Sequence, residues 1–344
     1  MTWKRPLPEP QGAIMQEVGK RNYPLIIGLL LTGLFLFVAF FGSSLAKGDP
    51  MLVIAEPVVV DGLTVFPSRN PVPPLAVSRL PLGTDNAGRD LLTRLLFAIR
   101  PTLILCFVVA SLRIAIGLVL GLMAGWFGGL AERVIDLLTG ASLAIPILIF
   151  ALAVISFLGE RTLWTFVVAL AATGWANTAV FVKNSTLVTK QSPYIEGARA
   201  VGVRPFGILR RYIMPQLWPI LPAQIAFELS AALLVVAELG FLGMFIGEAF
   251  VRLIEDPNSA GTIPVGLTAS FPELAQMLSD FWSKMIVSPW EIAIVGFIIF
   301  LQIFAFNMLG EGLRRQMDVT RPRHVWWRRR QPDLAMPPQT AKPV

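Results

Sequence analysis

Long apolar runs with almost no charged side chains dominate this sequence and limit what it can fold into. Each run is about as long as the roughly 20 residues that a bilayer-spanning helix needs. Because lipid offers backbone N–H and C=O groups no partner, each run must be helical. The sequence therefore predicts an all-α integral membrane protein with six transmembrane helices. The runs lie near residues 24–42, 101–130, 137–159, 162–182, 215–247 and 292–310.

Composition narrows the possible functions. Apolar residues make up 55% of the 344 and charged residues only 15%, against about 25% in soluble domains. A single cysteine, Cys106, and a single histidine, His324, rule out a disulfide within the chain. They also argue against a Cys/His zinc site and against a hydrolase triad. We therefore expect no catalytic residue, no metal site and no cofactor.

The positive charge of the chain predicts its orientation. The net charge is +7. Six spans put both termini on one side, and most of the 29 lysines and arginines lie in the tails and loops of that side. Cytoplasmic segments of membrane proteins are enriched in these residues. We predict a multi-pass protein of the cell inner (plasma) membrane with both termini cytoplasmic.

Both ends of the chain have a second interpretation. The basic C-terminal tail, residues 319–344, contains tryptophans beside arginines, a pattern that favours anchoring to anionic membrane lipid over binding nucleic acid. At the N-terminus, basic residues before an apolar run resemble a cleavable signal peptide. The apolar run from 25 to 41 is long for a signal core, which favours a span that is retained.

Two long loops on the opposite side carry helical patterns. Residues 88–99 repeat leucine and isoleucine on one face and leave Arg89 and Arg94 polar, which predicts a helix lying in the membrane surface. Residues 273–285 form an apolar stripe with Glu273 and Lys284 outside it. These helices are either a docking surface for an external partner or interfacial anchors.

Three charged residues lie within the predicted spans. Arg113, Glu228 and Glu238 either line a translocation path or pair with neighbours and fix helix packing. Glycines at four-residue spacing in the second span predict close approach of another helix. Prolines in the third and fifth spans predict kinks. The glycines are Gly117, Gly121, Gly125 and Gly129, and the prolines are Pro146, Pro219 and Pro222.

The fourth loop predicts a compact docking element on the cytoplasmic side. A short helix from about 194 to 201 should end at Gly202, because glycine favours the position after a helix. A second helical segment should follow and end before Pro215. Small residues in the first helix permit close docking into a groove of another protein, and Glu196 can meet a cation there. The candidate residues are Glu196, Gly197, Ala198, Arg199, Gly202 and Pro215.

This loop resembles the "EAA" loop of binding-protein-dependent ABC transporter permeases. Glu196, Ala198, Gly202 and Pro215 fall on that signature, whereas Gly197 replaces its first alanine. Residues 82–90 (LGTDNAGRD), 272–278, 288–290 and 307–314 are similar to further motifs of the dipeptide/oligopeptide/nickel group, C-type subunit. The stretch 244–271 is longer than is usual there.

The resemblance implies a type I ABC importer permease fold with a cytoplasmic coupling helix. It divides the chain into an N-terminal tail, first span and outer loop (1–80), a permease core of five spans (81–318) and a basic tail (319–344). The sequence contains no G-x-x-x-x-G-K-[ST] motif, so two separate ATPase subunits would dock on residues 196–215. A second, B-type permease subunit and an external solute-binding protein would complete the complex.

Other functional classes remain open from the residues alone. An ion- or proton-coupled secondary transporter would use Arg113, Glu228 and Glu238, but inverted repeats, which would favour it, are not seen. A membrane scaffold would leave transport unaffected on deletion. The solute stays open among dipeptides, longer peptides, nickel chelates and opines.

Overall fold

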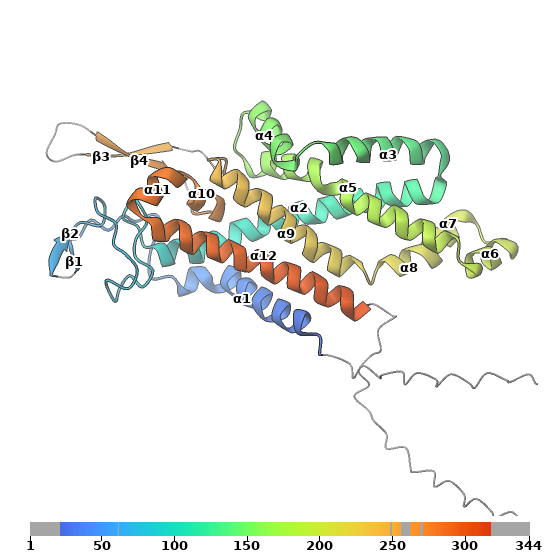
Figure 1. Cartoon of the computed structure of the whole chain (residues 1–344), viewed down its shortest axis with the longest axis horizontal. Coiled ribbons are helices and arrows are strands. Elements are labelled where there is room, and N and C mark those ends of the chain that lie inside the picture. The colour runs from blue at the N-terminus through green and yellow to red at the C-terminus, as the bar shows by residue number, and fades with distance from the viewer. Residues whose placement is uncertain (1–20, 61, 248–249, 256–261, 269–270, 318–344) are drawn as a thin grey trace, which may run out of the picture.

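The structure is a computed structural model that describes residues 21–60, 62–247, 250–255, 262–268 and 271–317. Long helices run side by side, and irregular segments and hairpins gather at one end of them (Figure 1). We call this the β end; it holds the described residues of the segments 46–90 and 242–288. The opposite end, which we call the α6 end, holds residues 191–220 together with the start of the first helix and the end of the last (Figure 1). The predicted C-terminal tail lies outside the described residues.

Among the described residues, five straight helices are long and apolar enough to cross a membrane. A sixth candidate is a pair of helices, α3 (Gly129–Ala144) and α4 (Ile147–Leu158), that meet at an angle of 91°. Pro146 lies between them, and its ring prevents α3 from continuing as a regular helix. The six predicted runs and the predicted break at Pro146 are thus found. The straight helices are α1 (Tyr23–Leu45), α2 (Leu91–Phe127), α5 (Leu163–Lys190), α9 (Leu221–Phe241) and α12 (Pro289–Met317).

The predicted surface helix at 88–99 is wrong as a separate element. Residues 91–99 form the first turns of α2, which continues through Pro101. Asp90 caps the helix, since its carboxylate accepts hydrogen bonds from the N–H groups of Leu92 and Thr93. The leucine face is buried in the protein, and so are Arg89 and Arg94. The arginines are buried because both find a carboxylate partner nearby.

Glycines let α2 pack closely against α5. A Cβ atom placed on Gly117 would lie 2.6 Å from the Cβ of Thr178, and one on Gly121 would lie 2.6 Å from the carbonyl oxygen of Ala179. Gly125 faces α5 in the same way. The fourth predicted member, Gly129, does not belong to this contact, because it begins α3 after the chain has turned.

The first span packs against the last as part of the bundle. The Asn22 side chain donates to the carbonyl oxygen of Gly312 over 2.8 Å. A Cβ atom on Gly28 would lie 2.3 Å from the backbone nitrogen of Leu309. Two helices so distant in sequence therefore pack closely along their length.

The β end is built from two hairpins and two short helices. Strands β1 (Val58–Val60) and β2 (Leu63–Val65) pair antiparallel, as do β3 (Phe250–Glu255) and β4 (Thr262–Thr268). The β3–β4 hairpin lies within the long stretch 244–271 and projects from this end (Figure 1). Helices α10 (Leu274–Leu278) and α11 (Phe281–Val287) follow.

The predicted apolar stripe over 273–285 is wrong, because this segment is two helices rather than one. Asp280 adopts a left-handed backbone conformation, with φ of 55°, and ends the helical register. As a result Glu273 and Lys284 are buried, whereas Trp282 is 79% exposed. Charged residues enter the interior here because they meet partners from other segments.

Candidate functional site

The α6 end carries the predicted docking element. Helix α6 (Pro193–Ala200) ends just before Gly202, whose φ of +81° is the left-handed conformation that glycine adopts readily. The N–H of Val203 donates to the carbonyl oxygen of Ala198 over 3.0 Å and closes the end of the helix. A short helix with a glycine stop is therefore present, as the sequence predicts.

The second helical segment extends further than predicted. Helix α7 (Pro205–Ile208) continues as a π-helical turn, η1 (Leu209–Ile213), and then as α8 (Met214–Leu217). Pro215 therefore lies inside the helical segment rather than after it. It is tolerated because it occupies the first turn of α8, where a missing N–H costs little.

Helix α6 buries one face and exposes the other. Ile195 and Ala198 are buried together with Ile208 of α7, which fixes α6 against the following segment. Glu196, Gly197 and Arg199 are exposed. The packing thus holds the short helix in place while its polar face stays open to a partner.

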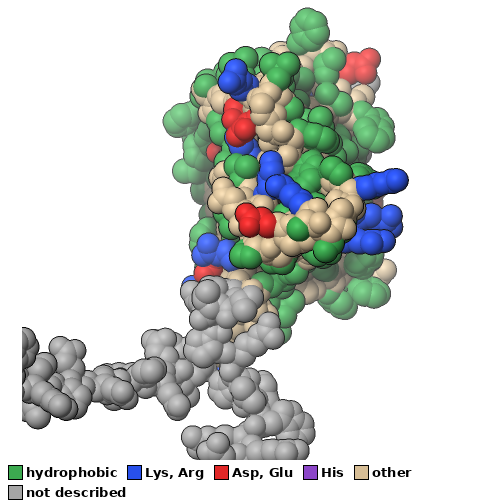
Figure 2. Space-filling model, turned by 90° about the vertical axis from the view of Figure 1, so that its right-hand side faces the viewer, with side chains coloured by type: hydrophobic (Ala, Val, Ile, Leu, Met, Phe, Trp, Pro, Cys, Tyr) green, Lys and Arg blue, Asp and Glu red, His purple; other side chains and the backbone are tan. Residues whose placement is uncertain are grey.

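Basic side chains tie this element to the end of α2. The Lys190 ammonium donates to the carbonyl oxygen of Trp126 over 2.8 Å. The Arg199 guanidinium lies 5.8 Å from the centre of the Trp126 ring, a distance at which a cation is attracted to an aromatic face. Figure 2 looks onto the α6 end, where Lys and Arg side chains are spread over the face between apolar ones.

Two large apolar side chains stand out from the same element. Val201 is 79% exposed and Phe206 is 72% exposed. They flank Gly202 at the turn between α6 and α7. Apolar side chains next to exposed charges at a chain turn are typical of a protein interface.

Two of the three charged residues in the spans come together. Arg113 of α2 and Glu228 of α9 are both buried, with 3.5 Å between Nη1 and Oε2. The Arg113 guanidinium also donates to the carbonyl oxygen of Leu170 over 2.8 Å, and Glu228 accepts from the Thr178 hydroxyl over 2.9 Å. The pair therefore links α2, α5 and α9, which is the arrangement expected of residues that fix packing.

Glu238 lies apart from this pair. It is ten residues beyond Glu228 in the same helix, a separation of about 15 Å along the axis. Its side chain is half-buried, and within the described part of the chain it forms no ion pair. The structure therefore does not join the three charges into one site.

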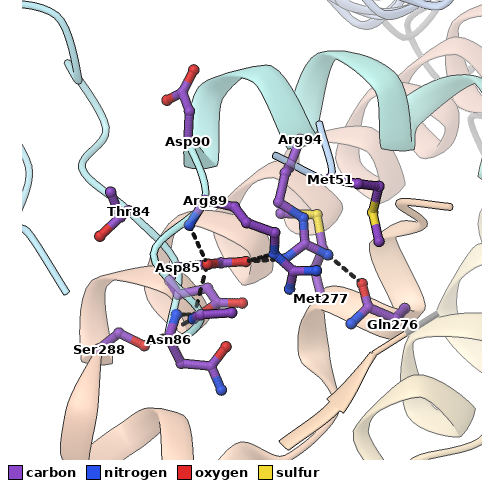
Figure 3. Close-up of polar contacts among 12 residues, drawn as sticks. Met51, Thr84, Asp85, Asn86, Arg89, Asp90, Arg94, Gln276, Met277 and Ser288 are labelled. Atoms are coloured by element: carbon purple, nitrogen blue, oxygen red, sulfur yellow. Dashed lines mark hydrogen bonds and ion pairs between the residues drawn. The ribbon is translucent and has the colours of Figure 1, made fainter. Parts of the chain in front are cut away.

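A second charged cluster lies at the β end, where the sequence motif 82–90 meets α2. The Asp85 carboxylate accepts from the Arg89 Nε over 2.7 Å and also pairs with Arg94. The Arg94 guanidinium then donates to Gln276 of α10 over 2.5 Å. Figure 3 shows both arginines directed at the Asp85 carboxylate, with Gln276 on the far side of Arg94.

The Asp85 cluster is almost fully buried. Asp85, Arg89 and Arg94 are at most 2% exposed. The carboxylate also accepts the backbone N–H groups of Ala87 and Arg89. Although burial opposes the charged form, the two arginines and these hydrogen bonds lower the pKa of Asp85 to about 2. The site is thus an ionised junction between the loop, α2 and α10.

A neighbouring ion pair extends this junction to the start of α12. The Lys284 ammonium lies 2.9 Å from the Glu291 carboxylate, and both side chains are buried. Glu291 also accepts the N–H of Asn86, and the Trp290 ring N–H donates to the carbonyl oxygen of Thr84. Sequence reasoning missed the hydrogen bonds to Asn86 and Thr84, since they join residues 205 and 206 positions apart. The four-residue spacing of Asp85 and Arg89 is the only local signal.

Glu273 is a buried carboxyl at the base of the 244–271 stretch. One of its oxygens accepts the N–H of Ile246 over 3.0 Å. The other, Oε1, has no hydrogen-bond partner among the described residues. Burial therefore raises the pKa of Glu273 to about 7, despite that hydrogen bond. In the folded protein the carboxyl therefore stays protonated at mildly acidic pH and ionises near pH 7.

We expect stability to fall as pH rises through this range. The ordinary pKa of this carboxyl is 4.5, and in the folded protein the pKa is about 7. The folded state binds the proton more tightly than the unfolded state, so this contribution to stability is lost as the pH rises through 7. From pH 5 to pH 8 the free energy of unfolding should decrease by about 3 kcal/mol. Thermal unfolding of purified protein across this range measures it.

The Glu273→Gln variant should lose most of that pH dependence, because its side chain does not titrate. Glu56→Gln, at an exposed position of the same end, is the matched control and should keep the slope. An unchanged slope in Glu273→Gln would contradict the prediction.

Comparison with known proteins identifies the family. The model of the "Binding-protein-dependent transport system inner membrane component" family matches residues 117–318. This region covers more than half of the chain, from the middle of α2 to the end of α12. It includes the α6–α8 element and the Arg113-bonded turn of α5.

Named relatives match over most of their length. The glutathione transport system permease protein GsiD of Pectobacterium atrosepticum is 31% identical over 69% of this chain and 71% of its own. The dipeptide transport system permease protein DppC of Alkalihalophilus pseudofirmus is 28% identical over 87% of this chain and 86% of its own. A solved chain of the MetNI methionine ABC transporter in inward-facing conformations is 20% identical over 66% of this chain and 95% of its own, with a TM-score of 0.48.

The family match and the helical architecture agree. The expected all-α membrane fold of a transport permease is confirmed, with five long apolar helices among the described residues and the bent α3–α4 pair as the candidate for the sixth span. The expectation of a transport subunit is confirmed as well. The chain belongs to the family of inner membrane components of binding-protein-dependent transport systems.

Proposed function

We propose that this permease subunit couples to its ATPases through α6 and the turn that follows it. The observation that carries the proposal is the exposed polar face of α6 on a buried apolar base, next to Val201 and Phe206. Glu196 would meet a basic group or helix N-terminus of the ATPase. Gly202 would set the angle between α6 and α7, because its left-handed backbone strains any other residue.

The remaining partners follow from this role. Two ATPase subunits would bind α6 here and its counterpart in a second, B-type permease subunit. A solute-binding protein would deliver solute at the β end, where the loops and the β3–β4 hairpin lie. Closure of the ATPases would then rock the two permeases between inward- and outward-facing states. No residue of this chain would perform covalent chemistry.

The orientation supports the same proposal. If the α6 end is cytoplasmic, both chain termini share that side, because the start of α1 and the end of α12 lie there. The excess of lysine and arginine on these segments favours this orientation. Membrane lipid would contact the basic tail, and nucleic acid is not expected to bind.

The solute class follows from the relatives. The names of the two relatives refer to glutathione and dipeptide transport, so a short peptide or related small solute is the best proposal for this chain. A secondary transporter driven by Arg113, Glu228 and Glu238 is not favoured, since Arg113 and Glu228 are buried against each other and Glu238 lies elsewhere. The translocation role of these three residues stays a prediction.

Variants of the docking element test the coupling. In the assembled complex, Glu196→Ala and Gly202→Asp should each reduce ATPase stimulation by the binding protein about tenfold, a loss of roughly 1.4 kcal/mol in coupling. Assembly should be retained, because both positions are exposed. Glu160→Ala removes an exposed carboxylate between α4 and α5, outside the α6–α8 element, and should act like the unchanged protein. Full stimulation in both loop variants would refute the coupling role.

A further inference from the structure

The middle of α5 exposes polar side chains where a lipid-facing helix would be apolar. Asn177 lies halfway along α5 and is exposed. Asn184, two turns further on the same face, is exposed too. Neither side chain hydrogen-bonds to another residue in the part of the chain that the structure describes. Because an unpaired amide in hydrocarbon is costly, this face requires water or polar groups of another molecule.

Two hollows lie beside Asn177, under the bend between α3 and α4. They measure about 150 and 200 Å³ and share Ser142, Ile145 and Thr173 as lining residues. Asn177 lines the first and Trp175 the second. Their walls are mostly apolar and carry a few hydroxyl and amide groups, and none of the described lining residues is charged.

The buried ion pair lies directly behind this wall. A Cβ atom on Gly174 would lie 2.3 Å from the central carbon of the Arg113 guanidinium, and Thr173 accepts from Arg113 over 3.2 Å. The same turn of α5 therefore contacts Arg113 on one side and lines the hollows on the other. Since Glu228 compensates the charge of Arg113, the wall of the hollows is nearly neutral.

We propose that the hollows under the α3–α4 bend, with Asn177, form this subunit's share of the solute path and contact uncharged amide groups of a peptide solute. Hydroxyl and amide side chains recognise peptide N–H and C=O groups whatever the solute's own side chains are. Charged termini would be held elsewhere, because no charged residue lines this site. The inference rests on the proposed transport role and specifies where on α5 it is performed.

Cysteine labelling tests the water access of this face. The only native cysteine, Cys106, is buried and is first replaced by alanine. In that background, Asn177→Cys is compared with Phe107→Cys, a position on α2 that is 57% exposed and expected to face lipid. The probe is a positively charged methanethiosulfonate, which needs a hydrated thiolate.

In the assembled transporter, Asn177→Cys should react at least about tenfold faster than Phe107→Cys, because only a hydrated thiol ionises readily. Equal rates would overturn the proposal, since the face would then be in lipid or covered by the second permease. During ATP turnover with the cognate binding protein, a casein peptide digest should slow the reaction about threefold, whereas sucrose should not. Rates unaffected by the digest would overturn the assignment to peptide groups.

The outcome is separable from failure of the coupling proposal. Coupling is read from Glu196→Ala and Gly202→Asp, which leave the hollows unchanged. If those variants keep full stimulation while Asn177→Cys is labelled and protected, coupling fails and the path assignment stands. If they lose stimulation while Asn177→Cys is inert, the reverse holds.

Discussion

Replacing Asp85 by alanine should lower the free energy of unfolding by about 3–5 kcal/mol, the cost of leaving buried charges without their partner. Both Arg89 and Arg94 depend on this carboxylate, and both are at most 2% exposed. Neither guanidinium can lose its proton, so neither can escape the penalty by titration. Thermal or denaturant unfolding in detergent measures the loss.

The size of the stability loss distinguishes a carboxylate that compensates two buried arginines from one that only caps a helix. Asp90, five residues later, also accepts two backbone N–H groups at the start of α2. Asp90→Ala should cost only about 1 kcal/mol, the usual value for a helix cap. Asp85→Asn should resemble Asp85→Ala, because it keeps the shape and removes the charge. Equal small losses in all three variants would show that the arginines are not held by Asp85.

Acid should destabilise the unchanged protein in the way that the Asp85 substitution does, because it protonates the same carboxylate. The folded pKa of Asp85 is about 2 and the ordinary value is 3.8. Its contribution to stability is therefore complete above pH 4 and is lost as the pH falls toward 2. Glu273 acts in the opposite direction at higher pH, so the two groups set separate limits on the stability of the β end.

The sequence predicted the elements better than their contacts. The spans followed from charge-free runs, and the end of α6 followed from Gly202, because both depend on local physics. Lys284 is buried although its partner, Glu291, is close in sequence, because the two meet only where the chain turns between α11 and α12. Burial of a charged side chain depends on such turns and on contacts between distant segments, which the apolar pattern alone does not show.

The candidate site, too, was only partly predictable from the sequence. Residues 196–202 form one local helix and turn, so the sequence alone predicted the short helix and its end at Gly202. The sequence placed Arg113 and Glu228 within spans. It could not show that they pair, because α2 and α9 come together only in the folded bundle. The sequence did not single out Asn177, because one asparagine in an apolar run does not reveal which way its side chain faces.

Contacts between spans are where the second large effect should appear. Gly121→Ala should reduce the free energy of unfolding by about 3 kcal/mol, the upper part of the range for an overpacked core. The new Cβ would lie 2.6 Å from the Ala179 carbonyl oxygen and 2.7 Å from the Cβ of Val182. A Cβ atom cannot rotate away, so α2 and α5 must separate.

The same substitution at Gly140 isolates this contact from helix propensity. Within the part of the chain that the structure describes, nothing lies within 4 Å of a Cβ placed on Gly140 of α3. Alanine there should raise stability by about 0.5–1 kcal/mol, because glycine is unfavourable within a helix. Unfolding of both variants should therefore shift in opposite directions. A shift of the same sign would mean that α2 and α5 are not in close contact at Gly121, and that the bundle tolerates their separation.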